Sequence, residues 1–444
     1  MVPLSFLNIA ALLLCATAQS ITVLQHALSA HGFSAVYRTD TSYKNVSKAF
    51  KKRFTFAPIA VAFPTFVAQV SAAIAARAAP NLEVVARSGG HSYIANGLGG
   101  RNGALVVDLS KMKAITVRPS NNTAIIETGN RLGDVALALN SQGRALPHGT
   151  CSYVGKGDHS VVVANGTIVT ASPNVNPDLY FAIRGASLSF GIVTSIEVQT
   201  FPAPPSAIVF EYKWNNVDIT TASNGIASFQ TFVATNLPQE FGAELVFTTG
   251  VKKGQVNFGL TGAWYGDANL FNSTIALYLN TLPKNISSTD KFCADSPNTF
   301  YTKSLMTPSG APMSKAVITA FVTYMANENF TSDTDWFVEV ELYGGTNSAI
   351  NAVPLDSAAF AKRNTLFAFQ FYASSSNGDP PYPKDGFSFL DSMVASITDS
   401  SPANWNYGLA NAAKLYYGTH YERLVSLQSV LDPRDTFRFP VGVA

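Results

Sequence analysis

Charged residues are scarce in this chain of 444 residues. Asp, Glu, Lys and Arg together make up 13% of it, whereas about a quarter is usual in globular proteins. The 30 basic and 28 acidic residues nearly cancel, and the longest basic run is Lys51-Lys52-Arg53. Because nucleic-acid binding needs a basic patch or stripe, we expect no nucleic-acid partner.

Cysteine is also rare. The chain has three, of which Cys15 lies in the apolar N-terminal stretch, so that Cys151 and Cys293 are the two outside it. Two cysteines cannot build the disulfide framework of a small secreted scaffold. Either they pair with each other across a long loop, or each remains a thiol.

Long hydrophobic runs are missing as well, and no stretch is long enough to span a bilayer. An apolar segment from Leu4 to Cys15 followed by Ala16-Thr17-Ala18 predicts a signal peptide over residues 1–18. Six N-x-S/T sequons are typical of a secreted glycoprotein: Asn45, Asn121, Asn165, Asn272, Asn285 and Asn329. We therefore expect an extracellular protein with no membrane partner.

The length exceeds what one hydrophobic core usually serves, so two large domains are expected. Hydrophobic periodicity predicts helices over residues 65–79, 132–139, 313–330 and 411–431, and strands over 82–87, 105–109, 190–201, 208–213, 256–264 and 336–343. A proline-rich break at residues 201–206 separates a region of short alternating strands and helices from one of longer strands.

The feature with the clearest chemical meaning is ARSGGHSYIANGLGG, residues 86–100. A strand runs into two glycines and His91, and further glycines follow. Such glycine density at a strand end lets the backbone approach a phosphate or a flat cofactor. Taken alone, a histidine in such a loop is more often a structural hydrogen bonder than a cofactor ligand.

Two further blocks follow in order: LPHGTCSYVG at residues 146–155 and NPDLYFAIRGA at 176–186, which leads into SFGIVT at 189–194. With the first block they resemble the vanillyl-alcohol-oxidase-type (PCMH-type) FAD-binding domain. More narrowly, they resemble the berberine-bridge-enzyme-like oxidases, and in particular fungal oligosaccharide oxidases. The resemblance extends from about Arg53 to the C-terminus.

This resemblance implies an α+β fold. It predicts a two-lobed PCMH-type FAD-binding domain at residues 50–203 and a substrate domain at 204–400, in which helices flank an antiparallel sheet. A C-terminal berberine-bridge-like segment, 401–444, would return to the FAD domain. The resemblance also implies a monomer.

The cofactor implied is FAD, attached covalently through His91. Cys151 matches the cysteine that forms a second flavin bond in some members, although a disulfide with Cys293 remains an alternative. The other cofactor-binding positions carried over from the family lie in the glycine-rich loops and the strand that follows them: Arg87, Ser88, Gly89, Gly90, Ser92, Gly155, Gly191, Ile192 and Val193.

The resemblance also assigns catalysis. Tyr407, in Asn404-Trp-Asn-Tyr407, would be the general base, and Glu341 would accept its proton through a hydrogen-bonded relay. Strand alternation places Glu339 on the same face as Glu341, an arrangement that is costly to bury unpaired. Substrate-binding positions are Tyr93, Tyr301, Glu339 and Gln370, and no metal site is expected.

The chain departs from the family after His159. There the family continues through a glycine-rich loop and a strand, whereas Ser160 leads directly into the later hairpin, and Asp158 stands where a glycine is expected. A carboxylate at that position would repel a phosphate. The cause is either a misassigned exon junction or a degenerate protein, and the well-kept flanking blocks favour the first.

The function predicted is that of a secreted FAD-dependent oxidoreductase. It would oxidise a hydroxyl group, in particular the anomeric carbon of an oligosaccharide, with oxygen as acceptor. A secondary-metabolite alcohol oxidase on the same scaffold is the alternative within the enzyme class. A flavin-free homologue that only binds carbohydrate is the alternative outside it.

Overall fold

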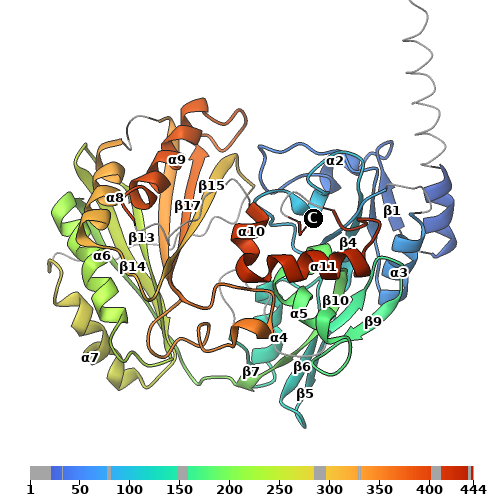
Figure 1. Ribbon diagram of the computed structural model, residues 1–444, viewed down its shortest axis with the longest axis horizontal. Helices are drawn as coiled ribbons and strands as arrows, with labels where there is room; N and C mark the ends of the chain where they lie inside the picture. The colour runs from blue at the N-terminus through green and yellow to red at the C-terminus, as the bar shows by residue number, and fades with distance from the viewer. Residues whose placement is uncertain are drawn as a thin grey trace, which may run out of the picture.

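The computed structural model describes residues 22–32, 34–77, 82–147, 159–284, 297–328, 330, 332–401, 412–438 and 442–443. Three small sheets lie on one side of the molecule, and one large sheet with its helices lies on the other (Figure 1). Helices and strands are mixed along the whole chain, which confirms the predicted α+β class. No helix in the described ranges has the length and apolar character needed to cross a bilayer.

The first small sheet has four strands in the order β1-β2-β4-β3, with β2, β4 and β3 parallel and β1 antiparallel to β2. Its strands are short and almost wholly apolar, as is usual for parallel strands covered on both faces. Helix α3 (Val67–Ala75) packs its buried side chains into the same core. The strands are β1 (Ser34–Tyr37), β2 (Ala60–Phe63), β3 (Val84–Arg87) and β4 (Leu105–Asp108).

The second sheet is antiparallel and has five strands in the order β5-β6-β10-β8-β9. These are β5 (Ile115–Arg118), β6 (Thr123–Glu127), β8 (His159–Val162), β9 (Ile168–Ala171) and β10 (Ile192–Gln199). Helices α4 (Leu132–Asn140) and α5 (Pro177–Ala186) accompany it, and β7 (Arg144–Ala145) pairs with β11 (Phe201–Pro202). Strands β5 and β6 form a hairpin around Asn121-Asn122.

The large antiparallel sheet has six strands in the order β12-β14-β13-β16-β17-β15. They are β12 (Ile208–Asp218), β13 (Phe241–Thr249), β14 (Gln255–Trp264), β15 (Phe300–Pro308), β16 (Thr334–Leu342) and β17 (Thr365–Ser375). Helices α6 (Ile219–Val233), α7 (Ala268–Leu279), α8 (Lys315–Glu328) and α9 (Lys384–Thr398) lie with it (Figure 1). One aromatic-rich core lies between the sheet and these helices, so alternate residues of each strand face the helices and the others face away from them.

The C-terminal helix predicted over residues 411–431 is not continuous. It consists of α10 (Ala412–Tyr417) and α11 (Tyr421–Leu431), and the break falls at Gly418, whose φ of 52° a helix does not accept. Helix α11 packs on α5, where Arg423 donates to Asp178 at 2.9 Å and its guanidinium lies 3.8 Å from the centre of the Phe181 ring. The predicted domain bounds 50–203, 204–400 and 401–444 stay predictions, and the leader over 1–18 lies outside the described residues.

Candidate active site

The glycine-rich loop begins where β3 ends. Arg87, predicted to bind cofactor, forms a buried ion pair with Asp108 at 2.5 Å, and it also donates to Val46 O at 2.6 Å. The side chain therefore anchors the loop to β4. If Arg87 contacts a cofactor, it does so through its backbone atoms.

The backbone of the loop itself is open. Gly90 has a φ of 74°, a conformation that favours glycine. Among the residues that the structure describes, the N–H groups of Gly89 and Gly90 donate to no partner. The Ser92 hydroxyl already has a partner within the loop. It accepts a hydrogen bond from the Asn96 N–H at 3.0 Å and so closes the turn that follows.

His91 is exposed at the tip of this loop. Its imidazole stacks on the Phe50 ring, with the ring centres 3.8 Å apart and the planes inclined by 29°. Tyr93 lies parallel to the same phenylalanine at 6.1 Å. Phe50 thus holds the predicted flavin-linking histidine and the predicted substrate tyrosine on one aromatic surface. No sequence motif marked Phe50 for this position.

The second wall of the site comes from the five-stranded sheet. The Ser88 hydroxyl donates to Thr128 O, and the Thr128 hydroxyl donates to Val193 O at 2.7 Å, so the loop is tied to β10. A Cβ on Gly191 would lie 2.6 Å from the side chain of Val161. Glycine is therefore required there for β10 to approach β8. Ile192 is buried beside it, in register with Val162.

The junction at Ser160 has a local irregularity. Between Val193 and Ser195 the register of β10 against β8 shifts, which leaves Thr194 as an extra residue. The polar groups of Thr194 are paired, because its hydroxyl lies 3.0 Å from Ser160 Oγ and its carbonyl accepts from Thr128 N–H at 3.0 Å. Paired polar groups thus accommodate the irregularity at Ser160, and Gly157 and Asp158 lie outside the described residues.

The large sheet contributes a cluster of three carboxyl groups on the face away from its helices. Glu339 and Glu341 share this face, as strand alternation predicted, and Glu244 of β13 lies opposite Glu341 in register. Carboxylate oxygens of the three residues all lie within 4.8 Å of one another. Gln370 of β17 pairs with Glu339, and its Nε2 donates to Glu339 Oε2 at 2.8 Å. Glu244 was not among the predicted residues, although it is the one charged residue of its strand.

These carboxyl groups resist ionisation. Burial, with the neighbouring acids Glu244 and Glu341 as a smaller cause, raises the pKa of Glu339 to about 8. Burial and then Glu341 raise the pKa of Glu244 to about 7, whereas burial alone raises the pKa of Glu341. Because Glu339 has the highest of these values, it is the member that keeps its proton at neutral pH, and Glu244 shares in holding protons as the pH falls below about 7. Three such oxygens would also suit a hard cation, which the sequence did not predict.

Aromatic rings connect this cluster to His91. Phe337 lies on the same sheet face as Glu339 and stacks on Tyr372 at 4.6 Å, and Tyr372 stacks on Phe300 at 4.7 Å. Phe300 meets Phe50 at 6.1 Å, beside the His91 ring. The predicted cofactor histidine and the predicted acids are thus joined by one row of buried aromatic rings, Phe50, Phe300, Tyr372 and Phe337.

Tyr301 does not belong to that row of rings. It is paired with Ala373 and points toward the helical side of the sheet, where its hydroxyl donates to Asp391 of α9 at 3.0 Å. The structure therefore separates Tyr301 from Glu339, Glu341 and Gln370. Cys151, Gly155 and Tyr407, together with Cys293, lie outside the described residues.

The described residues suit a flavin nucleotide. Uncommitted N–H groups at Gly89 and Gly90 can receive a phosphate or a polar ring edge. The exposed His91 ring is accessible for attachment.

Comparisons with known proteins agree with this fit. The family described as "FAD binding domain" matches residues 58–157, and the family described as "Berberine and berberine like" matches residues 395–444. A xylooligosaccharide oxidase of Thermothelomyces thermophilus is 33% identical over 469 residues, which cover 91% of each chain. A chitooligosaccharide oxidase of Gibberella zeae is 32% identical over 458 residues, which cover 90% of each.

A solved structure shares the fold. Glucooligosaccharide oxidase from Acremonium strictum, which has a 6-S-cysteinyl, 8α-N1-histidyl FAD, superposes with a TM-score of 0.81 at 28% identity. The superposition covers 95% of this chain and 98% of that one. Fold, site and relatives define the class as that of FAD-linked oxidases that act on CH–OH donors. The chain belongs to the berberine-bridge-enzyme-like family of these oxidases.

The same comparisons bear on the shortened segment. The alignment with the xylooligosaccharide oxidase extends over 469 positions, more than the 444 residues of this chain, so that relative has residues opposite gaps here. The match to the FAD-binding family ends at residue 157, next to the junction at which the sequence predicted a loss.

Proposed function

We propose that this protein oxidises the anomeric carbon of an oligosaccharide, with FAD attached through His91 and oxygen as the final electron acceptor. The observation that carries the proposal is the row of packed rings that joins His91 to the face bearing Glu339 and Glu341. Tyr93, half-buried beside His91, suits a sugar face, and the acids with the Gln370 amide suit sugar hydroxyls. The oligosaccharide oxidases named above support the substrate class.

When bound, FAD supplies the acceptor for the hydride that leaves the sugar carbon. The protein's part is to bind the sugar, orient it and receive the hydroxyl proton. Tyr407 is the proposed first acceptor, with Glu341 behind it. Since burial raises the pKa of Glu341, its carboxylate is a better proton acceptor than an ordinary one. The protons held on Glu339 and Glu244 let these groups donate hydrogen bonds to the sugar.

The first test addresses attachment. Tryptic peptides of the denatured protein should carry flavin mass on the peptide with His91, and on the peptide with Cys151 if a second bond exists. His91→Ala should leave flavin on Cys151 alone or on neither peptide. A flavin-free His91 peptide from a yellow wild-type protein would refute attachment there, and a Cys151–Cys293 disulfide would refute the second bond alone.

The second test addresses the reaction. Xylobiose, cellobiose and chitobiose should each be tried as the sole substrate, with hydrogen peroxide and the aldonic acid as the measured products. Peroxide without aldonic acid would place oxidation at another hydroxyl. Activity on aromatic or aliphatic alcohols but on no sugar would favour the secondary-metabolite oxidase.

A second candidate function rests on the shortened segment after residue 157. If the chain has lost donors that a pyrophosphate needs, it would bind carbohydrate without flavin. Colour separates the two functions, because a covalent flavoprotein stays yellow after acid precipitation. A colourless protein that still binds cellobiose in calorimetry would establish the second function.

We also propose that the protein is secreted, glycosylated and monomeric. The four sequon asparagines that the structure describes, Asn45, Asn121, Asn165 and Asn272, are all exposed. Enzymatic deglycosylation of protein from the culture medium should lower its mass, and light scattering should give the mass of one chain. An unchanged mass would refute glycosylation.

A further inference from the structure

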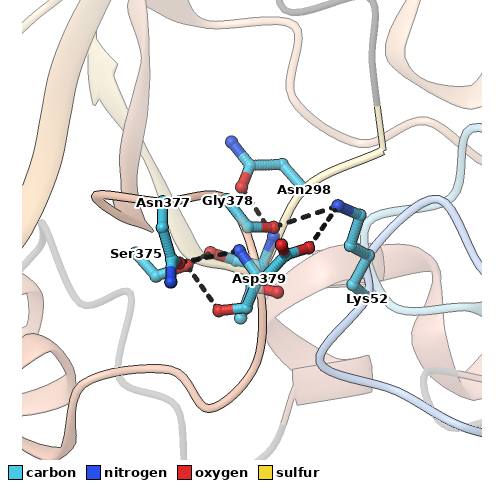
Figure 2. Close-up of polar contacts among 7 residues, drawn as sticks. Lys52, Asn298, Ser375, Asn377, Gly378 and Asp379 are labelled. Atoms are coloured by element: carbon cyan, nitrogen blue, oxygen red, sulfur yellow. Dashed lines mark hydrogen bonds and ion pairs between the residues drawn. The ribbon is translucent and has the colours of Figure 1, made fainter.

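A second polar site lies where the segment after Phe50 meets the end of the large sheet. The backbone of this segment pairs with Asn298: Lys52 N–H donates to Asn298 O at 2.8 Å, and Asn298 N–H donates to Phe50 O at 3.2 Å. Figure 2 shows how Lys52 then reaches outward, with its ammonium 2.8 Å from Asp379 and 3.2 Å from Gly378 O. The segment is thereby fixed to the loop that follows β17.

The chain turns here, because Phe54 N–H donates to Lys51 O at 3.1 Å, and the side chains of Lys51 and Arg53 both lie against the rings of Phe54 and Tyr301. Lys51 is only 2% exposed. Its ammonium lies 4.8 Å from the Phe300 ring centre and 5.2 Å from that of Phe54. Among the described residues, no carboxylate forms an ion pair with Lys51 or Arg53.

Arg53 is enclosed by rings as well. Its guanidinium carbon lies 4.9 Å from the Phe54 ring centre, 5.1 Å from that of Phe387 and 5.4 Å from that of Tyr301. Its buried Nε has no hydrogen-bond partner, and neither does the buried hydroxyl of Tyr382 nearby. The aromatic rings hold the guanidinium in place while leaving its donors uncommitted.

The nearest acid does not neutralise the pair. Asp391 of α9 is committed to Lys303 at 2.8 Å and to the Tyr301 hydroxyl at 3.0 Å. Two adjacent basic groups, one buried and one half-buried, therefore have no acidic partner among the described residues, an arrangement that costs stability when both are charged. Orphaned donors and unpaired charge of this kind mark sites that await an anion.

We propose that Lys51 and Arg53 bind the carboxylate of an acidic sugar unit, so that the oligosaccharide oxidised here carries a uronic acid. This rests on the proposed function. The two places are close together, because the buried ring of Phe300 packs against both Tyr372 on the acid-bearing face and the ammonium of Lys51. A sugar chain that crosses the edge strand β15 would place its carboxylate at Arg53, which keeps partial exposure.

Binding should take up a proton. Burial, and secondarily the charge of Arg53, lowers the pKa of Lys51 to about 7. A bound carboxylate favours the charged ammonium, so Lys51 should gain a proton when the ligand binds at pH 8. Other ionisable groups also surround Lys51 and Arg53. They are Tyr301 and Lys303 from β15, Tyr382, and Asp385 and Asp391 from α9.

The test compares two ligands that differ in charge: xylobiose bearing a glucuronic acid branch, and neutral xylotriose. Calorimetry on the purified protein should show the acidic ligand binding at least tenfold more weakly to Arg53→Gln than to wild type, with xylotriose changed less than twofold. Arg434→Gln, at an exposed remote position, is the control for charge. Titrations at pH 8 in buffers of different ionisation enthalpy should show proton uptake that Lys51→Met abolishes.

Each outcome decides the matter. Equal loss for both ligands in Arg53→Gln would mean a packing role and would overturn the proposal. Sodium sulfate that raises the melting temperature as much as the acidic sugar, and displaces it, would assign an inorganic anion site instead. Retained binding of the acidic sugar with no oxidation of any sugar would refute the proposed function but leave the anion site standing.

Discussion

The carboxyl cluster allows a sharp prediction for Glu339→Gln. Gln has the same size, and its amide oxygen can still accept the hydrogen bond that Gln370 donates at 2.8 Å. The substitution removes the group that can ionise, and burial at this site disfavours that ionisation. Burial and the neighbouring acids raise the pKa of Glu339 from 4.5 to about 8, so the folded protein keeps a proton that the unfolded chain releases near pH 4.3.

The sign follows from proton linkage. Between about pH 4 and 8 the folded state binds more protons, so its stability falls as the pH rises. The full shift corresponds to roughly 5 kcal/mol, and partial exposure with local relaxation reduces this to about 2 to 3 kcal/mol. Glu339→Gln does not suffer this loss. Its stability relative to wild type should therefore rise by about 2 to 3 kcal/mol between pH 5 and pH 8.

Tryptophan fluorescence provides the assay. Trp214, Trp264 and Trp336 are buried in the core of the large sheet, so urea unfolding followed by fluorescence reports on this sheet. Glu240→Gln, at an exposed position, is the control and should give a difference independent of pH. A constant difference between Glu339→Gln and wild type from pH 5 to pH 8 would refute the proton-holding cluster.

Three further predictions concern the site and its frame. Glu341→Gln should lower kcat by about a hundredfold with KM changed little, because the proton relay loses its acceptor; steady-state kinetics will show a KM effect instead if Glu341 only binds sugar. Gly191→Ala should destabilise by about 1 to 3 kcal/mol, since its Cβ would lie 2.6 Å from a valine methyl, whereas Gly133→Ala in α4 meets nothing within 4 Å and should be neutral or stabilising in thermal unfolding. Arg87→Met should cost about 3 to 5 kcal/mol because it leaves Asp108 buried without its partner, and Arg87→Met with Asp108→Leu should recover much of that loss in urea unfolding.

The strand and the loop that contain the predicted cofactor residues could be predicted because hydrophobic pattern and glycine content indicate the same structure there. The apolar run that became β3 ends in glycines, and Gly90 adopts the positive φ that such a sequence permits. The strand carrying Glu339 and Glu341 alternates regularly, so their common face followed from a period of two. At these positions local pattern and global fold require the same arrangement.

What could not be predicted depends on pairing between distant strands. Glu244 joins the cluster only because β13 pairs with β16 in a register that places it opposite Glu341, and no local pattern encodes that register. Phe50 reaches His91 from a loop that has no periodicity. Tyr301 was predicted on the substrate side through the family resemblance, yet its parity in β15 places it toward α9.

The shortened segment and the carboxyl cluster affect separate steps. The junction at residues 157–160 leads into β8, whose partners β10 and β9 belong to the five-stranded sheet, whereas the acids lie on the six-stranded one. At Ser160 the irregular register is accommodated by paired polar groups, so the strand forms despite the short connection. A loss at this junction would therefore reduce docking of the pyrophosphate without disturbing Glu339, Glu341 or Gln370. Restoring the segment should therefore increase the flavin content of the protein. The urea concentration at which the large sheet unfolds should be the same with and without the segment.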